Sequence, residues 1–297
     1  MDSSLLLQQL ANALSLGSLY ALIAIGYTMV YGILRLINFA HGDVFMLGAY
    51  VAFYAMTVAA MPWWVAFVVA IGLSGVFGVG LERIAYRPLR DSPKISIMVS
   101  AIGASFLIEN LGIVIFGGRP KSFPSIKLFD TVVTVGGVSV LSVSIFIPIF
   151  TAIILFGLLW LVGRTKTGMA MRAVSTDVDA ARLMAIDVNR VISITFGLGS
   201  LLAALGGIMW SMKYPQLNPL MGMMPGMKCF IAAVIGGIGN ILGAVLGGLL
   251  LGIIEILVVA FLPQLTGYRD ALAFILLIIV LIAKPAGLLG KRQTVKV

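Results

Sequence analysis

The chain has 297 residues, of which 61% are hydrophobic and only 10% are charged. Soluble domains carry about 25% charged residues, so the composition excludes an ordinary soluble enzyme and indicates that much of the surface faces membrane lipid. The sequence holds one cysteine, Cys229, and one histidine, His41. These leave neither a disulfide framework nor the ligands of a typical zinc site, and we expect no metal and no cofactor.

The apolar residues form continuous runs rather than alternating ones, which favours membrane-spanning helices over the strands of a β-barrel. A helix needs about 20 apolar residues to cross the hydrocarbon layer. We therefore expect an all-α polytopic membrane protein, a single transmembrane domain over residues 1–297 with about eight helical passes. In chain order the runs are Leu10–Leu34, Val44–Ala60, Pro62–Glu82, Ile95–Phe116, Ile145–Val162, Val191–Met212, Ile241–Leu262 and Ala271–Ala283.

Two of the intervening polar segments have a structure of their own. Residues 117–143 contain the β-prone stretches Thr131–Val135 and Val138–Val140 on either side of Gly136–Gly137, which predicts an external hairpin-like loop. Residues 163–190 form the longest polar segment. Because it lacks proline and is rich in Ala and Met, we expect it to be largely helical.

The basic residues indicate how the chain is oriented. Lys and Arg together number 20 and give a net charge of +9. They flank the apolar runs, so they indicate orientation in a bacterial inner membrane rather than binding to nucleic acid. Most of them are Arg35 and the Lys and Arg residues of the loop 83–94, of residues 163–190 and of the tail after Ala283. We place these segments and the C-terminus in the cytoplasm. The N-terminus is then outside, as are the remaining basic residues, Arg119, Lys121, Lys127, Lys213, Lys228 and Arg269.

The region between Lys213 and Gln264 starts and ends outside on this scheme. As one helix, Phe230–Leu262 would be only ~50 Å long, too short for two full crossings and a turn. We therefore expect a half-helix that enters the membrane, breaks at Gly236–Asn240 and returns.

Two interruptions of apolar sequence are candidates for a translocation pathway. Broken helices are tolerated inside membranes where they line a cavity or are buried in protein, and in transporters a pair of them indicates the substrate site. At the first interruption, an interfacial turn in which Asp43 caps the following helix is an equal alternative. The residues concerned are Asn38, His41, Gly42 and Asp43 in the first interruption, and Gly236, Gly237, Gly239 and Asn240 in the second.

Polar side chains within the spans add Glu109, Asn110 and Glu255 to the pathway candidates, because such groups are costly in lipid. A purely structural bond between helices is the alternative for Glu109 and for Glu255. Glycines spaced four apart after the second interruption, Gly243–Gly247 and Gly248–Gly252, favour close helix packing instead.

Residues 163–190 combine charges of both signs with Met169, Met171 and Met184. Methionine suits an adaptable docking surface, so we expect this segment to bind another protein. The alternative is an amphipathic helix that lies on the membrane. The sequence contains no phosphate-binding loop of the Walker type, and an intramembrane enzyme is disfavoured because no catalytic constellation is present. The energy for transport must then come from an ion gradient or from a separate ATPase.

Three motifs resemble known permeases. Residues Gly168, Arg172, Ala173, Asp179, Ala181 and Ile186 look like the cytoplasmic coupling segment of ABC importer permeases. The Ile37–Asp43 motif followed by Gly48–Tyr50, and the Gly236–Asn240 motif followed by Gly243, Ala244 and Gly247, resemble the high-affinity branched-chain amino acid permease family over essentially the whole chain. Ala185 stands where we expect that family to have glycine, and we expect little effect because alanine fits a helix better.

The resemblance implies an ABC-importer-type permease domain within a heteromeric importer. Its protein partners would be a second related permease subunit, two ATP-binding subunits and a periplasmic binding protein that delivers leucine, isoleucine or valine. Membrane lipid would surround the permease subunits. A Thr167–Asp187 helix would dock on the ATPase through Thr167, Gly168, Met169, Met171, Arg172, Ala173, Asp177, Asp179, Ala180, Ala181 and Met184. Related permeases carry urea, short amides or other amino acids. An ion-coupled secondary transporter, with Glu109, Asp43 and Glu255 as coupling acids, is the other alternative.

Overall fold

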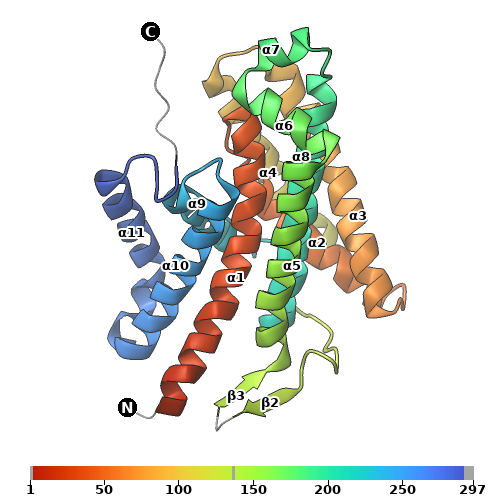
Figure 1. Ribbon diagram of the computed structural model, residues 1–297. Coiled ribbons are helices and arrows are strands. Elements are labelled where there is room, and N and C mark those ends of the chain that lie inside the picture. The colour runs from red at the N-terminus through yellow and green to blue at the C-terminus, as the bar shows by residue number, and fades with distance from the viewer. Residues whose placement is uncertain (1–2, 136–137, 291–297) are drawn as a thin grey trace.

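The computed structural model describes residues 3–135 and 138–290, and helices make up most of this part of the chain (Figure 1). A π-helical turn, Glu82–Tyr86, extends α3, and two 3-10 turns cover Arg87–Leu89 and Pro263–Tyr268. The helices are α1 (Ser3–Leu34), α2 (His41–Thr57), α3 (Trp63–Leu81), α4 (Lys94–Phe116), α5 (Ser142–Arg164), α6 (Lys166–Thr176), α7 (Val178–Leu183), α8 (Val188–Lys213), α9 (Met223–Gly236), α10 (Ile241–Phe261) and α11 (Arg269–Ala283).

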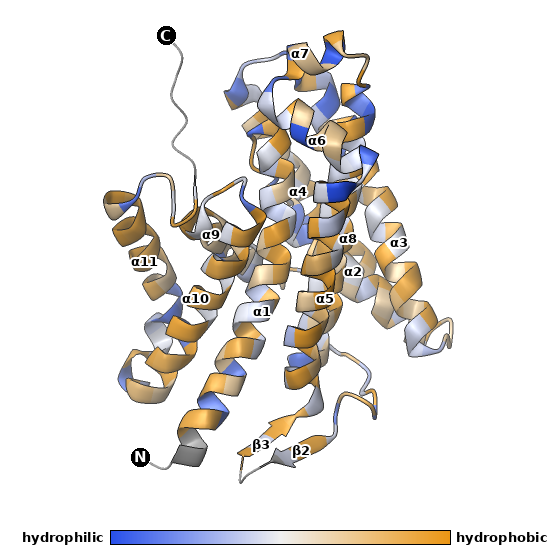
Figure 2. Ribbon diagram, viewed as in Figure 1, coloured by the Kyte–Doolittle hydropathy of each residue, from blue (hydrophilic) through white to orange (hydrophobic). Residues whose placement is uncertain are grey.

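Seven helices in the described part are long and apolar enough to cross a membrane, which confirms the all-α polytopic prediction. The expected pass at Val44–Ala60 forms the 17-residue α2, which is shorter than these seven. Hydrophobic residues cover α5, α10 and α11, whereas hydrophilic residues gather on α6 and α7 at one end (Figure 2). The candidate spans are Leu6–Leu34, Trp63–Leu89, Lys94–Phe116, Ser142–Arg164, Val188–Lys213, Ile241–Phe261 and Pro263–Ala283.

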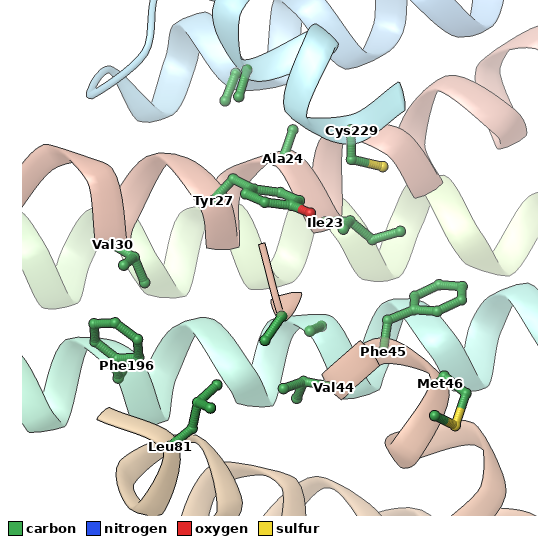
Figure 3. Packing of buried hydrophobic residues seen from close by; sticks show 14 of the residues in the cluster. Ile23, Ala24, Tyr27, Val30, Val44, Phe45, Met46, Leu81, Phe196 and Cys229 are labelled. Atoms are coloured by element: carbon green, nitrogen blue, oxygen red, sulfur yellow. The ribbon is translucent and has the colours of Figure 1, made fainter. Parts of the chain in front are cut away.

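The centre of the bundle is formed by α1 and α8, whose side chains are mostly buried. Glycines bring α10 close to α1, as the four-residue spacing predicted. A Cβ on Gly17 would lie 2.9 Å from the Cα of Leu249, and Gly248 and Gly252 face the backbone of α1 still more closely. Figure 3 shows the core beside this seam, where Tyr27 of α1 lies near Cys229 of α9.

The strands are short and lie at the end of the bundle that holds the start of α1 (Figure 1). Strands β2 (Val132–Val135) and β3 (Val138–Leu141) pair antiparallel, which confirms the hairpin, while its Gly136–Gly137 turn lies outside the described residues. Gln8 Nε2 donates to the Ser139 carbonyl at 3.0 Å and ties α1 to this hairpin. A second small pair joins β1 (Lys121–Ser122) to β4 (Gln216–Leu217).

The opposite end gathers the segments that the basic residues assigned to one side. Leu34, Arg90, Lys94 and Arg182 line a common pocket, so the end of α1, the basic loop and α7 lie together. The described residues after α11 also lie towards this side, because Leu289 bonds to Gly236 and the adjacent Gly239 lies against Gly32 near the end of α1. Between Lys213 and Gln264 the chain turns back, forms the short α9, breaks and returns as α10, as expected.

Candidate functional site

Two short helices, α2 and α9, meet at their N-termini in the interior of the bundle. The contact is between backbones: a Cβ on Gly42 would lie 2.6 Å from the carbonyl oxygen of Gly222, and a Cβ on Gly222 would come closer still to Gly42. Gly226 continues the contact, with its Cβ position 3.1 Å from the Cα of Gly42. Only residues without a side chain fit this junction, because a Cβ at that distance from backbone cannot be accommodated.

A pocket of about 170 Å³ opens at this junction. The first interruption therefore lies beside a cavity, which Gly42 and Asp43 line. The segment that meets this interruption across the pocket is the loop before α9, and not the Gly236–Asn240 break. The sequence did not reveal this contact, because the apolar Met221–Met224 stretch, where α9 begins, was interpreted as part of a loop. The lining residues are Tyr27, Ile37, Phe39, Gly42, Asp43, Ile102, Ser105, Phe106, Glu109, Gly222, Met223, Gly226, Met227 and Phe230.

Asp43 is the buried carboxylate of the pocket, with 3% of its surface exposed. It lies in the first turn of α2, but the alternative in which it caps that helix is wrong: Ala40 occupies the N-cap position, with no side-chain capping bond. The Asp43 carboxylate instead reaches α4, where the Ser105 hydroxyl donates to Oδ2 at 2.6 Å. The same acid is therefore available to both the pocket and the α2–α4 contact.

Asn38 and His41 do not line the pocket, and their side chains pack against neighbouring elements instead. The Tyr86 hydroxyl donates to Asn38 Oδ1 at 2.8 Å. His41 is fully buried, with its ring centroid 4.3 Å from that of Tyr27. Gly26 makes room for it, since a Cβ there would lie 2.6 Å from His41 Cε1. Both side chains hold α2 against α1 and the π-helical turn.

The two polar residues in the middle of α4 point in different directions. Glu109 lines the pocket on the side of Ser105. Asn110 is exposed, and its Nδ2 donates to the Phe106 carbonyl of its own helix at 2.7 Å. Only Glu109 of this pair therefore joins Asp43 at the pocket.

The Gly236–Asn240 break is a closed turn. The backbone amides of Leu288 and Leu289 donate to the carbonyls of Ile235 and Gly236 at 2.8 and 2.9 Å. Asn240 Nδ2 donates to the Leu289 carbonyl at 2.9 Å, and its Oδ1 accepts the Gly243 amide of α10 at 3.2 Å. The chain after α11 thus satisfies the polar groups that the break frees.

Glycines at this break fit backbone conformations and close contacts. Gly237 and Gly239 have φ of +109° and +93°, values that favour glycine. Gly236 lies against Gly243. Gly239 lines a second pocket beside Arg172 of α6, and this pocket shares no lining residue with the Asp43 pocket.

Glu255 belongs to a buried ionic network. Lys228 Nζ lies 2.9 Å from Glu255 Oε1 and 2.7 Å from Asp270 Oδ1, and the Tyr20 hydroxyl donates to Glu255 Oε2 at 2.8 Å. Placing Lys228 in an external loop was wrong, because α9 begins at Met223 and two carboxylates balance its charge. The available signal was one lysine within an otherwise apolar stretch.

The polar segment 163–190 folds as α6 and α7 rather than as one helix. Asp177 separates them, since its carboxylate accepts the Asp179 and Ala180 amides at 2.9 Å as the cap of α7. Asp187 caps α8 in the same way. This end of the molecule is therefore a compact pair of short helices above α1 and α8 (Figure 1).

Burial divides the predicted docking residues into two sets. Gly168, Met171 and Ala181 are buried, and Thr167 and Ala173 are partly so. The Arg172 guanidinium donates to the Val162 carbonyl at the end of α5, which gives it a structural bond. The exposed predicted residues are Met169, Arg172, Asp177, Asp179, Ala180 and Met184.

The most exposed apolar residues of this segment form its tip. Leu183, which sequence reasoning missed, is 87% exposed, and Met184 is 78% exposed. Ala185 follows with a φ of +59°. The expectation that alanine suits a helix there was wrong, because Ala185 lies in the turn between α7 and α8, where glycine is favoured.

The π-helical turn after α3 holds a buried acid that was also missed. Glu82 is fully buried and pairs with Arg90, and the Ser193 hydroxyl donates to Glu82 Oε2 at 2.6 Å. Arg90 also donates to Asn189 Oδ1 at 2.6 Å. Burial lowers the pKa of the Arg90 guanidinium, and the neighbouring Glu82 carboxylate opposes that shift. The pair joins the basic loop to the start of α8.

Comparison with known proteins identifies the family to which the chain belongs. Residues 9–281 match the family described as "Branched-chain amino acid transport system / permease component". The chain belongs to this permease family. It is thus a multi-pass membrane protein of the transporter permease class, as the motifs around Asn38 and Gly236 predicted.

Relatives extend the similarity over nearly the full length. The chain is 42% identical to the high-affinity branched-chain amino acid transport system permease protein BraD of Pseudomonas aeruginosa, over 98% of each chain. It is 42% identical to the corresponding permease protein LivH of Escherichia coli K12, over 98% of this chain and 97% of that protein. A probable branched-chain amino acid transport permease protein LivH of Methanocaldococcus jannaschii is 27% identical, over 95% of this chain and 91% of that protein.

Proposed function

We propose that this protein is one of two related permease subunits of an ATP-driven importer that carries leucine, isoleucine and valine into the cytoplasm. The observation that carries the proposal is the 42% identity to two branched-chain amino acid permeases over 98% of the chain. The same proposal includes three further points: the protein lies in a bacterial inner membrane, it forms a single permease domain, and a binding protein supplies the cargo.

The Asp43 pocket is the proposed part of the translocation pathway. Its groups complement an amino acid: two helix N-termini carry partial positive charge suited to a carboxylate, and the Asp43 and Glu109 carboxylates suit an ammonium group. Ile102, Phe106 and Phe230 supply apolar wall for a branched side chain. Asn38, His41 and Gly42 shape the site in this proposal, while Asn110, Glu255 and the Gly236–Asn240 turn lie elsewhere.

The α6–α7 pair is the proposed docking element for the two ATP-binding subunits, which would hydrolyse ATP. Its end of the molecule, shared with Arg35, the loop 83–94 and the segment after α11, is the cytoplasmic end in this proposal. Leu183 and Met184 form an exposed apolar tip on a polar surface, which is a feature of protein interfaces. Movement of this tip would be transmitted to α8 through the Asp187 cap.

The test is Leu183→Asp and Met184→Asp in the chain co-expressed with its second permease and ATPase subunits. We expect loss of ATPase co-purification and of ATP-dependent leucine uptake, because a charge is placed in an apolar contact. Leu128→Asp, at an exposed residue of the opposite end, is the control and is expected to leave both unchanged. Normal assembly of the tip variants, or ion-driven uptake by vesicles that hold this chain alone, would contradict the proposal.

A further inference from the structure

A pocket of about 460 Å³ lies where α3 ends and α8 begins, at the end of the bundle that carries the α6–α7 pair. Its polar lining is mostly basic. Arg83 and Arg87 come from the turns after α3, and Arg190 comes from the first turn of α8. Asn189 and Ser193 of α8 add an amide and a hydroxyl. We call this cavity, which three arginines line together, the arginine pocket.

The protein does not balance the charge of the arginine pocket. Among the described residues, its lining includes a single acid, Asp187, whose carboxylate accepts the backbone amide of Arg190 at 3.1 Å as the cap of α8. The nearby Glu82 is already paired with Arg90. Within the part of the chain that the structure describes, no salt bridge involves any of the three arginines. An anionic ligand would therefore relieve the repulsion between these like charges.

The arginine pocket lies at the depth of the lipid headgroups. Arg83 and Arg87 belong to the last two turns of the candidate span Trp63–Leu89, and Arg190 belongs to the first turn of the span Val188–Lys213. An arginine at the end of a span keeps its charged group in the interface while its aliphatic part contacts hydrocarbon. The anions present at this level of a membrane are the headgroups of acidic lipids.

An exposed apolar stripe leads away from the arginine pocket along α3, which lies at the edge of the bundle (Figure 1). Leu73, Val76 and Phe77 are 54%, 71% and 39% exposed, and Ile84 in the π-helical turn is 80% exposed. Their spacing of three, four and seven residues places them on one side of the helix. The rise from Leu73 to Ile84 is ~16 Å, about half of the ~30 Å hydrocarbon layer. The stripe therefore has the length of one lipid leaflet, with the arginine pocket at its end.

We propose that the arginine pocket binds the phosphate headgroup of an anionic phospholipid, whose acyl chain lies along the apolar stripe of α3. Arginine suits this role because its planar guanidinium donates two parallel hydrogen bonds to phosphate oxygens. A soluble phosphate would use the arginines but leave the stripe uncovered, and an acidic protein surface would need no apolar stripe of leaflet length. The bound lipid would bridge α3 and α8 at the point where α8 follows the α6–α7 pair. This lipid site is independent of the cargo that the protein carries.

Photo-crosslinking with lipids tests the proposal in the assembled transporter. The complex is placed in phosphatidylcholine vesicles that contain a small fraction of phosphatidylglycerol or phosphatidylcholine with the same photoactivatable acyl chain, and the labelled peptides are identified by mass spectrometry. We expect the phosphatidylglycerol probe to label residues 73–84 at least about fivefold more than the phosphatidylcholine probe, because one basic residue near an anionic lipid is worth about that factor.

Combining Arg83→Gln, Arg87→Gln and Arg190→Gln should lower this ratio to about one. The matched control combines Arg35→Gln, Arg164→Gln and Lys166→Gln, which remove the same charge from exposed residues at the same end, and it should keep the wild-type ratio. Arg190→Gln alone, at an exposed residue, should also lower the ratio and serves if the triple variant does not assemble.

Equal labelling of the wild-type protein by the two lipid probes would overturn the inference, as would an unchanged ratio in the Arg190→Gln variant. An equal loss in the control variant would show a general effect of charge without a specific pocket. Abolition of the preference by millimolar glycerol 3-phosphate would assign the pocket to a soluble phosphate instead. A preference that is seen only when the ATP-binding subunits are absent would assign it to a protein interface.

Discussion

The two interruptions of the membrane helices contain similar glycine-rich sequence but form different structures. At Asn38–Asp43, the N-terminus of α2 meets that of α9 and a pocket opens beside Asp43. At Gly236–Asn240, the chain after α11 returns and binds the free carbonyls of Ile235 and Gly236. At the first interruption the helix N-termini face a pocket, whereas at the second the returning chain binds the freed backbone groups, and the pocket that Gly239 lines lies on the α6 side.

The difference teaches what a broken helix means in a membrane protein. A break frees backbone amides and carbonyls that must find partners. Where a distant segment supplies those partners, the break is a structural turn. Where a helix N-terminus faces a cavity, the same free groups can serve a ligand. Glycine content alone does not distinguish the two, because glycine allows both close packing and unusual backbone.

The largest expected effect is at the closed break. Gly237→Ala should lower the free energy of unfolding by about 3 kcal/mol, because φ is +109° there and a Cβ would meet the backbone of Gly290. Thermal unfolding of the detergent-purified protein measures this. Uptake per folded molecule should stay near the wild-type value.

Gly157→Ala is the matched control, since nothing lies within 4 Å of its Cβ position and alanine favours the interior of α5. A stable Gly237→Ala protein that has lost uptake would reverse the assignment of the two breaks.

The open break should show the opposite behaviour. Asp43→Asn should reduce leucine uptake about tenfold, equivalent to roughly 1.4 kcal/mol of barrier, because the pocket loses a carboxylate. Stability should change little, since the amide oxygen can still accept the Ser105 hydroxyl. The measurement is initial uptake rate with expression and unfolding temperature determined in parallel, and unchanged uptake would remove Asp43 from the pathway.

The smallest effect is expected at Ala185, a non-glycine residue with a positive φ. Ala185→Gly should raise the free energy of unfolding by about 1 kcal/mol, because the φ of +59° strains any side chain. Uptake should be retained. A destabilised variant, seen by thermal unfolding, would show that unfolded-chain entropy outweighs the strain at this turn.

Features that depend on local sequence could be predicted well. Run length identified the spans, and alternating β-prone residues identified the β2–β3 hairpin. The half-helix before Gly236 followed from counting residues. Features that depend on distant partners could not be predicted. Lys228 is buried because Glu255 and Asp270 come to it from later helices, and nothing near Lys228 in the sequence announces them.

The same limit applied to the candidate site. The Asn38–Asp43 stretch was recognisable, but its partner at Gly222 lies in an apolar stretch with little polarity to mark it. Met169 and Met171 were predicted as one docking surface, yet two residues along a helix rotate the side chain to nearly the opposite face. Met169 is therefore exposed and Met171 buried.

The Lys228 network has a mechanical consequence for the pocket. Salt bridges to Glu255 and Asp270 fasten the middle of α9 to α10 and α11, and the bonds from Leu288 and Leu289 fasten its C-terminal end. Across the pocket, α4 is joined to α2 by the Ser105–Asp43 hydrogen bond. Displacing α9 separates several charged partners. Tilting α4 breaks two hydroxyl hydrogen bonds, from Ser105 to Asp43 and from Ser100 to the Ala85 carbonyl, and shifts the Phe116 ring that stacks on Tyr50. The wall formed by α4 is therefore the one that yields at the lower energetic cost.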